Sequence, residues 1–418
     1  MQKKVIHWIA IVALGLITIG IYQPKSHHSD IRIRGFESLA IAEALADHQG
    51  FSNPFLPMPT GPSAHIPPLY PAYLAFIMAL FGSGVLGAQI IIWSAATLLA
   101  VQMMLFPLLA EELGLGFWTG VVAAVAWMMA GIPPSYTWES NYAAVLVIAV
   151  SFLMGKSLVA ELTTKQIIVC GVLWGLLLLT QPATLLILPA WMLLLFLRKA
   201  VSLRKIAVLG LLPLLVVAPW MVRNFLVFHH FVFIRDNVGL ELAVSNNACA
   251  SALFEDNDRS QCFAATHPNE NYEEAMKVRQ LGEVEYNRQR LAEAKAWILA
   301  NPDGFARLTA QRFLAFWLPP KSENKGNGII WRPIVVQAFA LLSLAGLFLL
   351  WKSGRAGAYV VALWMVFFPP IYYLVQFMDR YRYPIFWATF LCGSYFLAEV
   401  MRGLFGVRQS EAQADPAA

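Results

Sequence analysis

The sequence PIVVQAFALLSLAGLFLLW, residues 333–351, contains no charged side chain. Its length is close to the ~20 apolar residues that an α-helix needs to cross the hydrocarbon core of a bilayer. Nine similar apolar stretches occur along the chain: residues 5–22, 85–108, 116–133, 142–160, 166–181, 183–197, 205–221, 357–376 and 384–402. We therefore predict an all-α integral membrane protein with about ten transmembrane helices.

The composition supports this fold class. Of the 418 residues, 58% are apolar and 13% are charged, about half of the ~25% charged fraction of a soluble domain. Such a composition excludes a soluble enzyme, a disordered chain and a coiled coil. The net charge of +5, from 30 basic and 25 acidic residues, is typical of basic cytoplasmic flanks. We expect no nucleic-acid partner, because no basic run with interleaved aromatic residues occurs outside the loops.

Residues 69–81 form an additional apolar stretch, which would make a helix of only ~20 Å. The distribution of basic residues indicates that this helix does not cross the membrane. If it is re-entrant or interfacial, twelve basic residues lie in short inside segments and five in the shorter outside loops, as the positive-inside rule requires. The inside residues are Lys3, Lys4, Lys156, Lys165, Arg198, Lys199, Arg204, Lys205, Lys352, Arg355, Arg402 and Arg408, and the outside residues are Lys25, Arg32, Arg34, Arg380 and Arg382. We therefore place the protein in the inner (plasma) membrane with both termini in the cytoplasm.

This topology divides the chain into four parts. They are an N-terminal membrane domain over 1–221 with a first outer loop over 23–68, an outer loop domain over 222–332, C-terminal membrane helices over 333–402 and a disordered cytoplasmic tail over 403–418. Within the outer loop domain the apolar spacing predicts one helix over 272–300 and another from Pro302.

The two loop cysteines, Cys249 and Cys262, are candidates for a disulfide if their loop faces an oxidising compartment. The alternative is a pair of free thiols. Cys170 and Cys392 lie inside apolar stretches, where a thiol acts as a small hydrophobic group.

The predicted spans contain almost no ionisable side chains, whereas Glu37, Glu139 and Glu241 lie at predicted outer helix ends and loops. This pattern favours chemistry at the outer membrane face over an ion path through the spans. Glu37 near a helix start can accept a proton from an acceptor hydroxyl, or it can simply favour the helix N-terminus. Glu139 is equally compatible with a solvated loop acid.

A rigid stretch rich in proline, Thr60 to Pro71, precedes the short helix and contains His65 and Tyr70. It can hold both side chains over a substrate cleft, or it can be a stiff connector. Arg223, Arg380 and Arg382 can bind a phosphate through charge-assisted contacts, or they can anchor the chain at the interface. Glu241, Asn246 and Tyr383 are further candidates for substrate contacts.

Read together, these stretches resemble the GT-C glycosyltransferases, and more narrowly the family 39 group. That group includes protein O-mannosyltransferases and the lipid A aminoarabinose transferase. The resemblance covers most of the chain. It is carried by Gly35-Phe36-Glu37 with Ile41-Ala42, Gly50-Phe51-Ser52-Asn53-Pro54-Phe55, Thr60-Gly61-Pro62, Pro68-Leu69-Tyr70-Pro71, Pro219-Trp220 with Arg223-Asn224, and Arg380-Tyr381-Arg382-Tyr383-Pro384.

The resemblance implies transfer of a sugar from a polyprenyl-phosphate donor to an acceptor hydroxyl of a glycan, lipid or protein. The transfer would invert the anomeric centre on the outer (periplasmic) face of the membrane. An acid of the first loop serves as base or helps to hold a metal. Glu37 lies where this acid is expected, while the family's Asp-Glu pair is absent and Asp30 is the second choice.

The family's lysine before the Pro-Pro-Leu-Tyr stretch is also missing, which leaves phosphate binding to Arg223, Arg380 and Arg382. A divalent cation is compatible with the sequence and is not required by it. The alternatives are a transporter or flippase of lipid-linked glycans and a structural membrane protein. Convergence of Glu37, Glu139, Arg223 and Arg382 in one pocket would favour the enzyme.

Overall fold

The computed structural model describes residues 2–22, 36–132, 138–320 and 331–413. Every regular element in these residues is a helix, and pairing between extended segments is limited to two isolated bridges, Ser52 with Pro62 and Leu253 with Phe377. The predicted all-α class is therefore confirmed.

Seven of the described helical segments are long and apolar enough to cross a membrane. They are α1 (Gln2–Tyr22), α4 (Val85–Glu112), α6 (Ser140–Val159), α9 (Leu203–Phe228), α16 (Arg332–Lys352), α17 with α18 (Gly357–Phe367 and Pro370–Leu374), and η3 with α19 (Asp379–Ile385 and Phe386–Gln413). Each coincides with one of the predicted spans, and the protein is a multi-pass membrane protein.

The remaining apolar helices are shorter. They are α3 (Leu69–Phe81), α5 (Phe117–Ala130), α7 (Thr164–Leu178), and η1 with α8 (Pro182–Thr184 and Ile187–Leu197). Three of the ten predicted spans fall on these short helices, so the count of ten stays a prediction. The predicted short helix over 69–81 is present as α3, but the structure contains no membrane that would show whether it is re-entrant.

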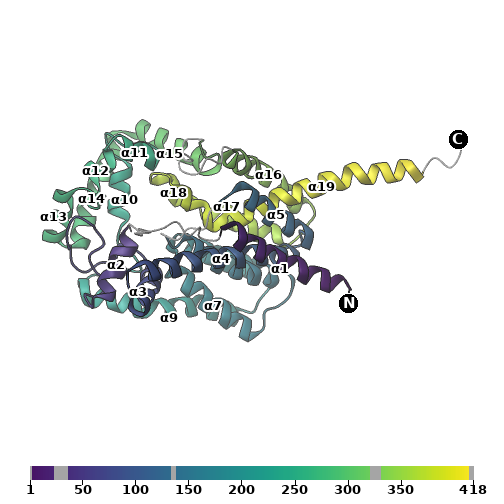
Figure 1. The fold of residues 1–418 in the computed structure, drawn as a ribbon, viewed down its shortest axis with the longest axis horizontal. Helices are drawn as coiled ribbons and strands as arrows, with labels where there is room; N and C mark the ends of the chain where they lie inside the picture. Colours follow the sequence, from purple (N-terminus) through teal and green to yellow (C-terminus); the bar gives the residue numbers. More distant parts are fainter. Residues whose placement is uncertain (1, 23–35, 133–137, 321–330, 414–418) are drawn as a thin grey trace.

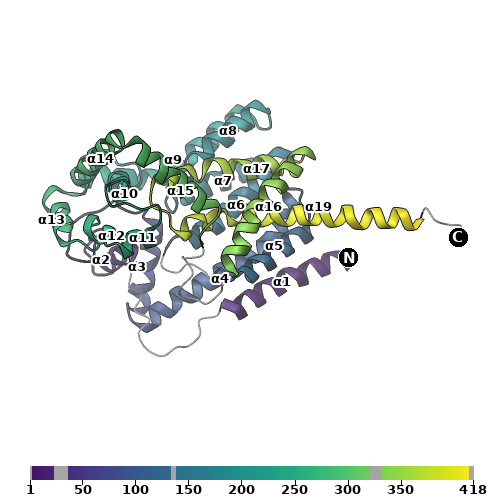
Figure 2. The same cartoon turned by 90° about the horizontal axis from the view of Figure 1, so that it is seen from above.

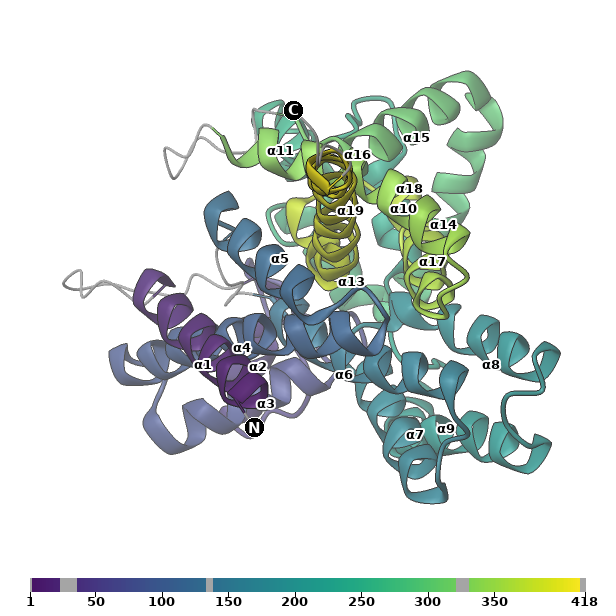
Figure 3. The same cartoon turned by 90° about the vertical axis from the view of Figure 1, so that its right-hand side faces the viewer.

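The membrane helices pack through small residues at their contacts. Figure 3 looks along the long axis of the molecule and shows α7, α8 and α9 together on one side, with α1, α4 and α5 on another. At the contact of α16 with α19, a Cβ on Gly346 would overlap the carbonyl group of Cys392. At the contact of α7 with α9, a Cβ on Gly175 would overlap the side chain of Val216. Such close approach is how membrane helices gain packing energy where lipid provides no hydrophobic drive.

The two polar regions, of which residues 36–68 (the first) and 229–320 (the second) are described, meet at one end of the bundle. The segment between α9 and α16 contains α10 (Val238–Ser245), α11 (Phe254–Arg259), α12 (Cys262–Thr266), α13 (Tyr272–Leu281), α14 (Glu283–Ala300) and α15 (Pro302–Trp317). Figures 1 and 2 show α11 to α14 beside α2 (Glu37–Ala46) and α3 at the left-hand end, while the start of α1 and the last turns of α19 lie at the opposite end. Both chain ends therefore lie far from the polar regions.

The helix predicted over 272–300 is divided into α13 and α14. Gly282 separates them with φ +80°, a left-handed backbone that ends α13 and begins α14. The spacing of apolar residues over 272–300 does not indicate this break. The division matters because it places Glu283 in the first turn of α14.

Candidate active site

Glu37 begins α2 and is 6% exposed. The alanine-rich sequence after it favours a helix, and its apolar face packs on α3 through Leu39, Ala42 and Leu74. Phe36, which precedes the helix, contacts the Trp138 ring with 4.6 Å between centroids. The carboxyl group of Glu37 is thus fixed at the start of a buried helix.

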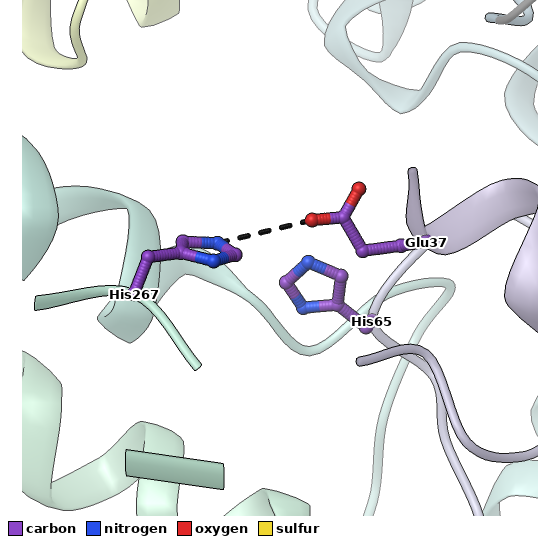
Figure 4. A group of neighbouring side chains, drawn as sticks. All are labelled: Glu37, His65 and His267. Carbon is purple, nitrogen blue, oxygen red and sulfur yellow. Dashed lines mark ion pairs between the residues drawn. The ribbon is translucent and has the colours of Figure 1, made fainter. Parts of the chain in front are cut away.

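Two histidines from distant segments complete a cluster with Glu37. Figure 4 shows Glu37, His65 and His267 pointing toward one another. Each contributes one potential ligand atom, and these atoms lie within 4.8 Å of one another. His267 Nε2 lies 3.9 Å from Glu37 Oε1. All three side chains are buried, so the cluster is shielded from water.

His267 follows α12, where its ring stacks on Phe263 with 4.5 Å between centroids. Its Nδ1 accepts a hydrogen bond from the Asn269 amide at 3.0 Å, which leaves Nε2 toward Glu37. His65 packs edge-on against Phe55, and its Nδ1 is buried without a hydrogen-bond partner among the described residues. No local motif connects His267 to Glu37, so this residue is absent from the site predicted from the sequence.

Burial controls the charge of this cluster. It raises the pKa of Glu37 to about 7, partly offset by the helix amide and the positive charge of Arg380. It lowers the pKa of His267 to about 3, aided by Arg290, and it lowers the pKa of His65 well below its usual value. Both imidazoles are therefore neutral near pH 7, and the 3.9 Å contact is not an ion pair.

Charged side chains surround the cluster. The Arg380 guanidinium lies 3.4 Å from the centroid of the Trp138 ring and interacts electrostatically with Glu37, Glu139 and Glu241. Arg235 also acts on Glu37, and its Nε donates to the carbonyl of His65 at 3.2 Å. The structure thus brings together Glu37, Glu139, Glu241, His65 and Arg380 of the predicted site, and it adds His267 and Arg235.

Other predicted site residues have different surroundings. Arg223 donates to the backbone carbonyls of Ser63 and Phe51 at 2.7 and 2.8 Å, and its guanidinium stacks on Trp220. This placement favours a structural role in holding the first polar segment over the predicted role in phosphate binding. Asn246 is similarly engaged, because its amide group bonds the buried guanidinium of Arg312 and the Leu374 carbonyl.

Three other predicted residues have mainly aromatic surroundings. Arg382 and Tyr383 are buried in the aromatic core of the bundle, against Phe386 and Trp127 respectively. Tyr70 packs against Tyr142. Asp30, the second choice for the base, lies outside the described residues.

Cys249 and Cys262 are joined by a disulfide in the structure. Cys262 is the first residue of α12, the helix that His267 follows. The cross-link therefore ties the His267 segment to the end of α10.

We expect Cys249→Ser to lower the free energy of unfolding by about 2–4 kcal/mol, because the disulfide restricts the unfolded chain. Thermal unfolding in detergent measures the change. Adding a reductant to the wild type should reproduce it, while Cys170→Ser, at a cysteine that is free, serves as the cross-link-independent control. Equal unfolding of the wild type with and without reductant would show that the cross-link contributes nothing.

Two further acids are buried near the His65 segment. Burial raises the pKa of Glu283 to about 8, against the opposing effect of its hydrogen bonds from Ser63 and Ala64. Burial also raises the pKa of Asp236 to about 6. Sequence reasoning did not select either residue, since both occur among many loop acids.

These shifts predict a loss of stability with rising pH. The unfolded chain releases both protons near its ordinary values of 3.8 and 4.5, whereas the folded protein keeps them to about 6 and 8. At these two acids the folded state binds more protons in this window, so their contribution to stability falls as pH rises through it. We expect the unfolding temperature in detergent to fall between about pH 5 and about pH 9 by ~2 °C more in the wild type than in Glu283→Gln, because the variant has no proton to release at this position. The same change in both proteins would contradict this assignment.

No model of a known protein family matches the sequence, and no curated protein matches it. Solved structures do match. The oligosaccharyltransferase AglB from Archaeoglobus fulgidus, in complex with an inhibitory peptide and a dolichol-phosphate, aligns with a TM-score of 0.56 at 13% identity. The alignment covers 100% of this chain and 52% of that one. The chain has the GT-C fold.

Two more structures of the Archaeoglobus fulgidus oligosaccharyltransferase give the same result. Its apo form matches with a TM-score of 0.57 at 14% identity, covering 100% of this chain and 53% of that one. Its complex with Zn and sulfate matches with a TM-score of 0.55 at 14% identity, covering 97% and 50%. The chain therefore spans about half the length of these oligosaccharyltransferase structures. Identity this low shows the shared fold and leaves the activity to be argued from the site.

Proposed function

We propose that the protein is an inverting membrane glycosyltransferase that moves a sugar from a polyprenyl-phosphate donor to an acceptor hydroxyl. The observation that carries the proposal is the convergence, on a GT-C fold, of Glu37 with Glu139, Glu241, Arg235 and Arg380. A structural protein has no need to collect a buried acid and neighbouring cations at the end of its bundle. Arg223 and Arg382 are not part of this convergence, so phosphate binding is assigned to Arg380 and Arg235.

The chemistry needs one base and a stabilised leaving group. The acceptor oxygen attacks the anomeric carbon, the bond from this carbon to the phosphate oxygen breaks, and the proton of the acceptor passes to Glu37. The polyprenyl phosphate leaves with its negative charge facing Arg380 and Arg235, where preorganised cations stabilise it. Direct displacement inverts the anomeric centre and does not require the carboxyl pair of a glycosidase.

The cluster is also suited to a divalent cation. Glu37, His65 and His267 offer one carboxylate oxygen and two imidazole nitrogens within 4.8 Å, and burial keeps both imidazoles in the neutral form that binds metal. A bound cation would polarise the acceptor hydroxyl or the donor phosphate. Metal analysis of the purified protein, compared with His267→Ala, tests binding independently of activity.

The sidedness is part of the proposal. The polar regions lie at the end of the molecule opposite the described ends of the chain (Figure 1), and the basic residues favour cytoplasmic termini in the inner (plasma) membrane. The cluster would then face the periplasm, where acceptor glycans, lipids or proteins are exposed. The archaeal oligosaccharyltransferase was solved with a dolichol-phosphate, which supports a lipid-phosphate donor for this fold.

A transfer assay tests the function directly. The purified protein in lipid is given a panel of radiolabelled polyprenyl-phosphate sugars and a crude cell-envelope acceptor pool. We expect label to pass from at least one donor to the acceptor pool and polyprenyl phosphate to be released in equal amount. Movement of intact donor across sealed vesicles without transfer would overturn the enzyme in favour of the flippase.

A further inference from the structure

We propose that Glu283 is a positioning residue: from the start of α14 it holds the Ser63–His65 segment, and so sets the His65 ring beside Glu37. The expected effect of Glu283 on sugar transfer rests on the proposed function, but its effect on the position of His65 does not. Glu283 belongs to the second polar region and does not touch the proposed reacting groups, so its effect on them passes through the backbone of the first.

The carboxyl group of Glu283 bonds the segment with both oxygens. Its Oε2 accepts from the Ser63 hydroxyl at 2.6 Å and its Oε1 accepts from the Ala64 amide at 2.6 Å. Glu283 is 4% exposed, and Ser63 and Ala64 are fully buried. Water cannot replace these contacts, so loss of the carboxyl group would leave two buried donors without an acceptor.

Ser63 connects Glu283 to His65, because Ser63 Oγ also accepts a hydrogen bond from the His65 amide at 2.9 Å. The carbonyl groups of the segment are held separately. Arg223 Nη1 donates to the Ser63 carbonyl at 2.7 Å, and the Asp236 amide donates to the Ala64 carbonyl at 2.8 Å. The amide side of the segment thus depends on Glu283, and the carbonyl side depends on other residues.

The His65 ring is positioned by this backbone and by packing against the rings of Phe55 and His267. Its Nδ1 is buried without a hydrogen-bond partner among the described residues, and its ring packs edge-on against Phe55 at 5.1 Å between centroids. A ring positioned by packing moves with its own backbone. If the hydrogen bonds from the segment to Glu283 are lost, His65 should therefore move away from Glu37 and water should enter the cluster.

The test measures the exposure of His65 and the transfer rate in the same variants. Glu283→Ala removes both acceptors. Glu283→Gln keeps an oxygen for the Ala64 amide and can donate to Ser63 Oγ, so it should rescue the arrangement. The matched control is Tyr286→Phe, also on α14, which removes the buried hydrogen bond from the Tyr286 hydroxyl to Glu274 on α13. It leaves the bonds of Glu283 to Ser63 and Ala64 in place. Modification of His65 by diethyl pyrocarbonate, mapped by mass spectrometry, reports its exposure.

We expect His65 to be protected in the wild type, in Glu283→Gln and in Tyr286→Phe, and to react at least ~10-fold faster in Glu283→Ala. The turnover of Glu283→Ala should fall by about 10–100-fold, with the donor KM almost unchanged, because the bound donor remains near Arg380 while the cluster is misplaced. A merely destabilising change would instead give Glu283→Ala and Tyr286→Phe the same pattern.

Protection of His65 in a folded Glu283→Ala protein would overturn the inference. If that variant does not fold, Ser63→Ala takes its place, since it removes one bond to Glu283 and the link to the His65 amide. Its His65 should then react faster than in the wild type, and unchanged protection would be equally decisive against the inference. Exposure of His65 in a protein that transfers no sugar in any variant would uphold the positioning and reject the proposed function.

Discussion

Glu37→Gln is expected to lower sugar transfer by about 10²–10⁴-fold, because an amide cannot accept the proton of the acceptor hydroxyl. The variant should remain folded. Gln has nearly the same shape, and replacing a buried acid whose pKa is raised to about 7 removes the need to desolvate a carboxylate. Transfer rates and thermal unfolding in the same detergent measure the two effects separately.

Glu43→Gln is the matched control, because Glu43 lies on the same helix and is exposed. It should transfer sugar at the wild-type rate. Wild-type turnover in Glu37→Gln would show that Glu37 is not the base, and Glu139 and Asp30 would then be tested. Loss of transfer in both variants would point to a general effect on α2.

Arg380→Gln should reduce kcat/KM for the donor by about 10²–10³-fold, mainly through the loss of a preorganised cation at the departing phosphate. The guanidinium also interacts with three carboxylates, Glu37, Glu139 and Glu241, so its removal leaves their mutual repulsion uncompensated. Arg380→Lys should recover only part of the activity, since an ammonium group lacks the planar fork that binds phosphate and stacks on Trp138.

The control for this experiment is Arg307→Gln, at an exposed arginine on α15. Binding of a polyprenyl phosphate without sugar, measured by its protection against thermal unfolding, separates donor affinity from chemistry. Wild-type donor kinetics in folded Arg380→Gln would remove Arg380 from the phosphate site and leave Arg235 as the cation to be examined.

The fold class could be predicted from the sequence because the signal is local. An uncharged stretch such as residues 333–351 is stable in a bilayer only as a helix, whatever it packs against. The limits of this prediction are physical as well. The stretch over 116–133 contains α5, which ends at Ala130, and a helix of 14 residues is shorter than the ~20 residues that cross a bilayer.

Part of the site also has a local signal. Glu37 stands before an apolar helix, and Arg380 sits in a basic aromatic run, so both could be selected from residue type and position. That Glu37 and Arg380 lie close together could not be predicted from the sequence. His267 is part of no sequence motif. Arg223, which was predicted to bind the phosphate, donates hydrogen bonds to the carbonyl groups of Ser63 and Phe51 instead.

Hydrophobicity and charge act residue by residue, so the chain alone predicts a helical membrane protein whose acids and arginines concentrate in its polar regions. Which of these side chains meet depends on how distant segments pack. The bond between Ser63 and Glu283 joins residues 220 positions apart, and the contact of Glu37 with His267 depends on the same docking of the two polar regions. Burial then set the charge of the cluster, since desolvation depends on the packed surroundings of a group and not on its neighbours in the chain.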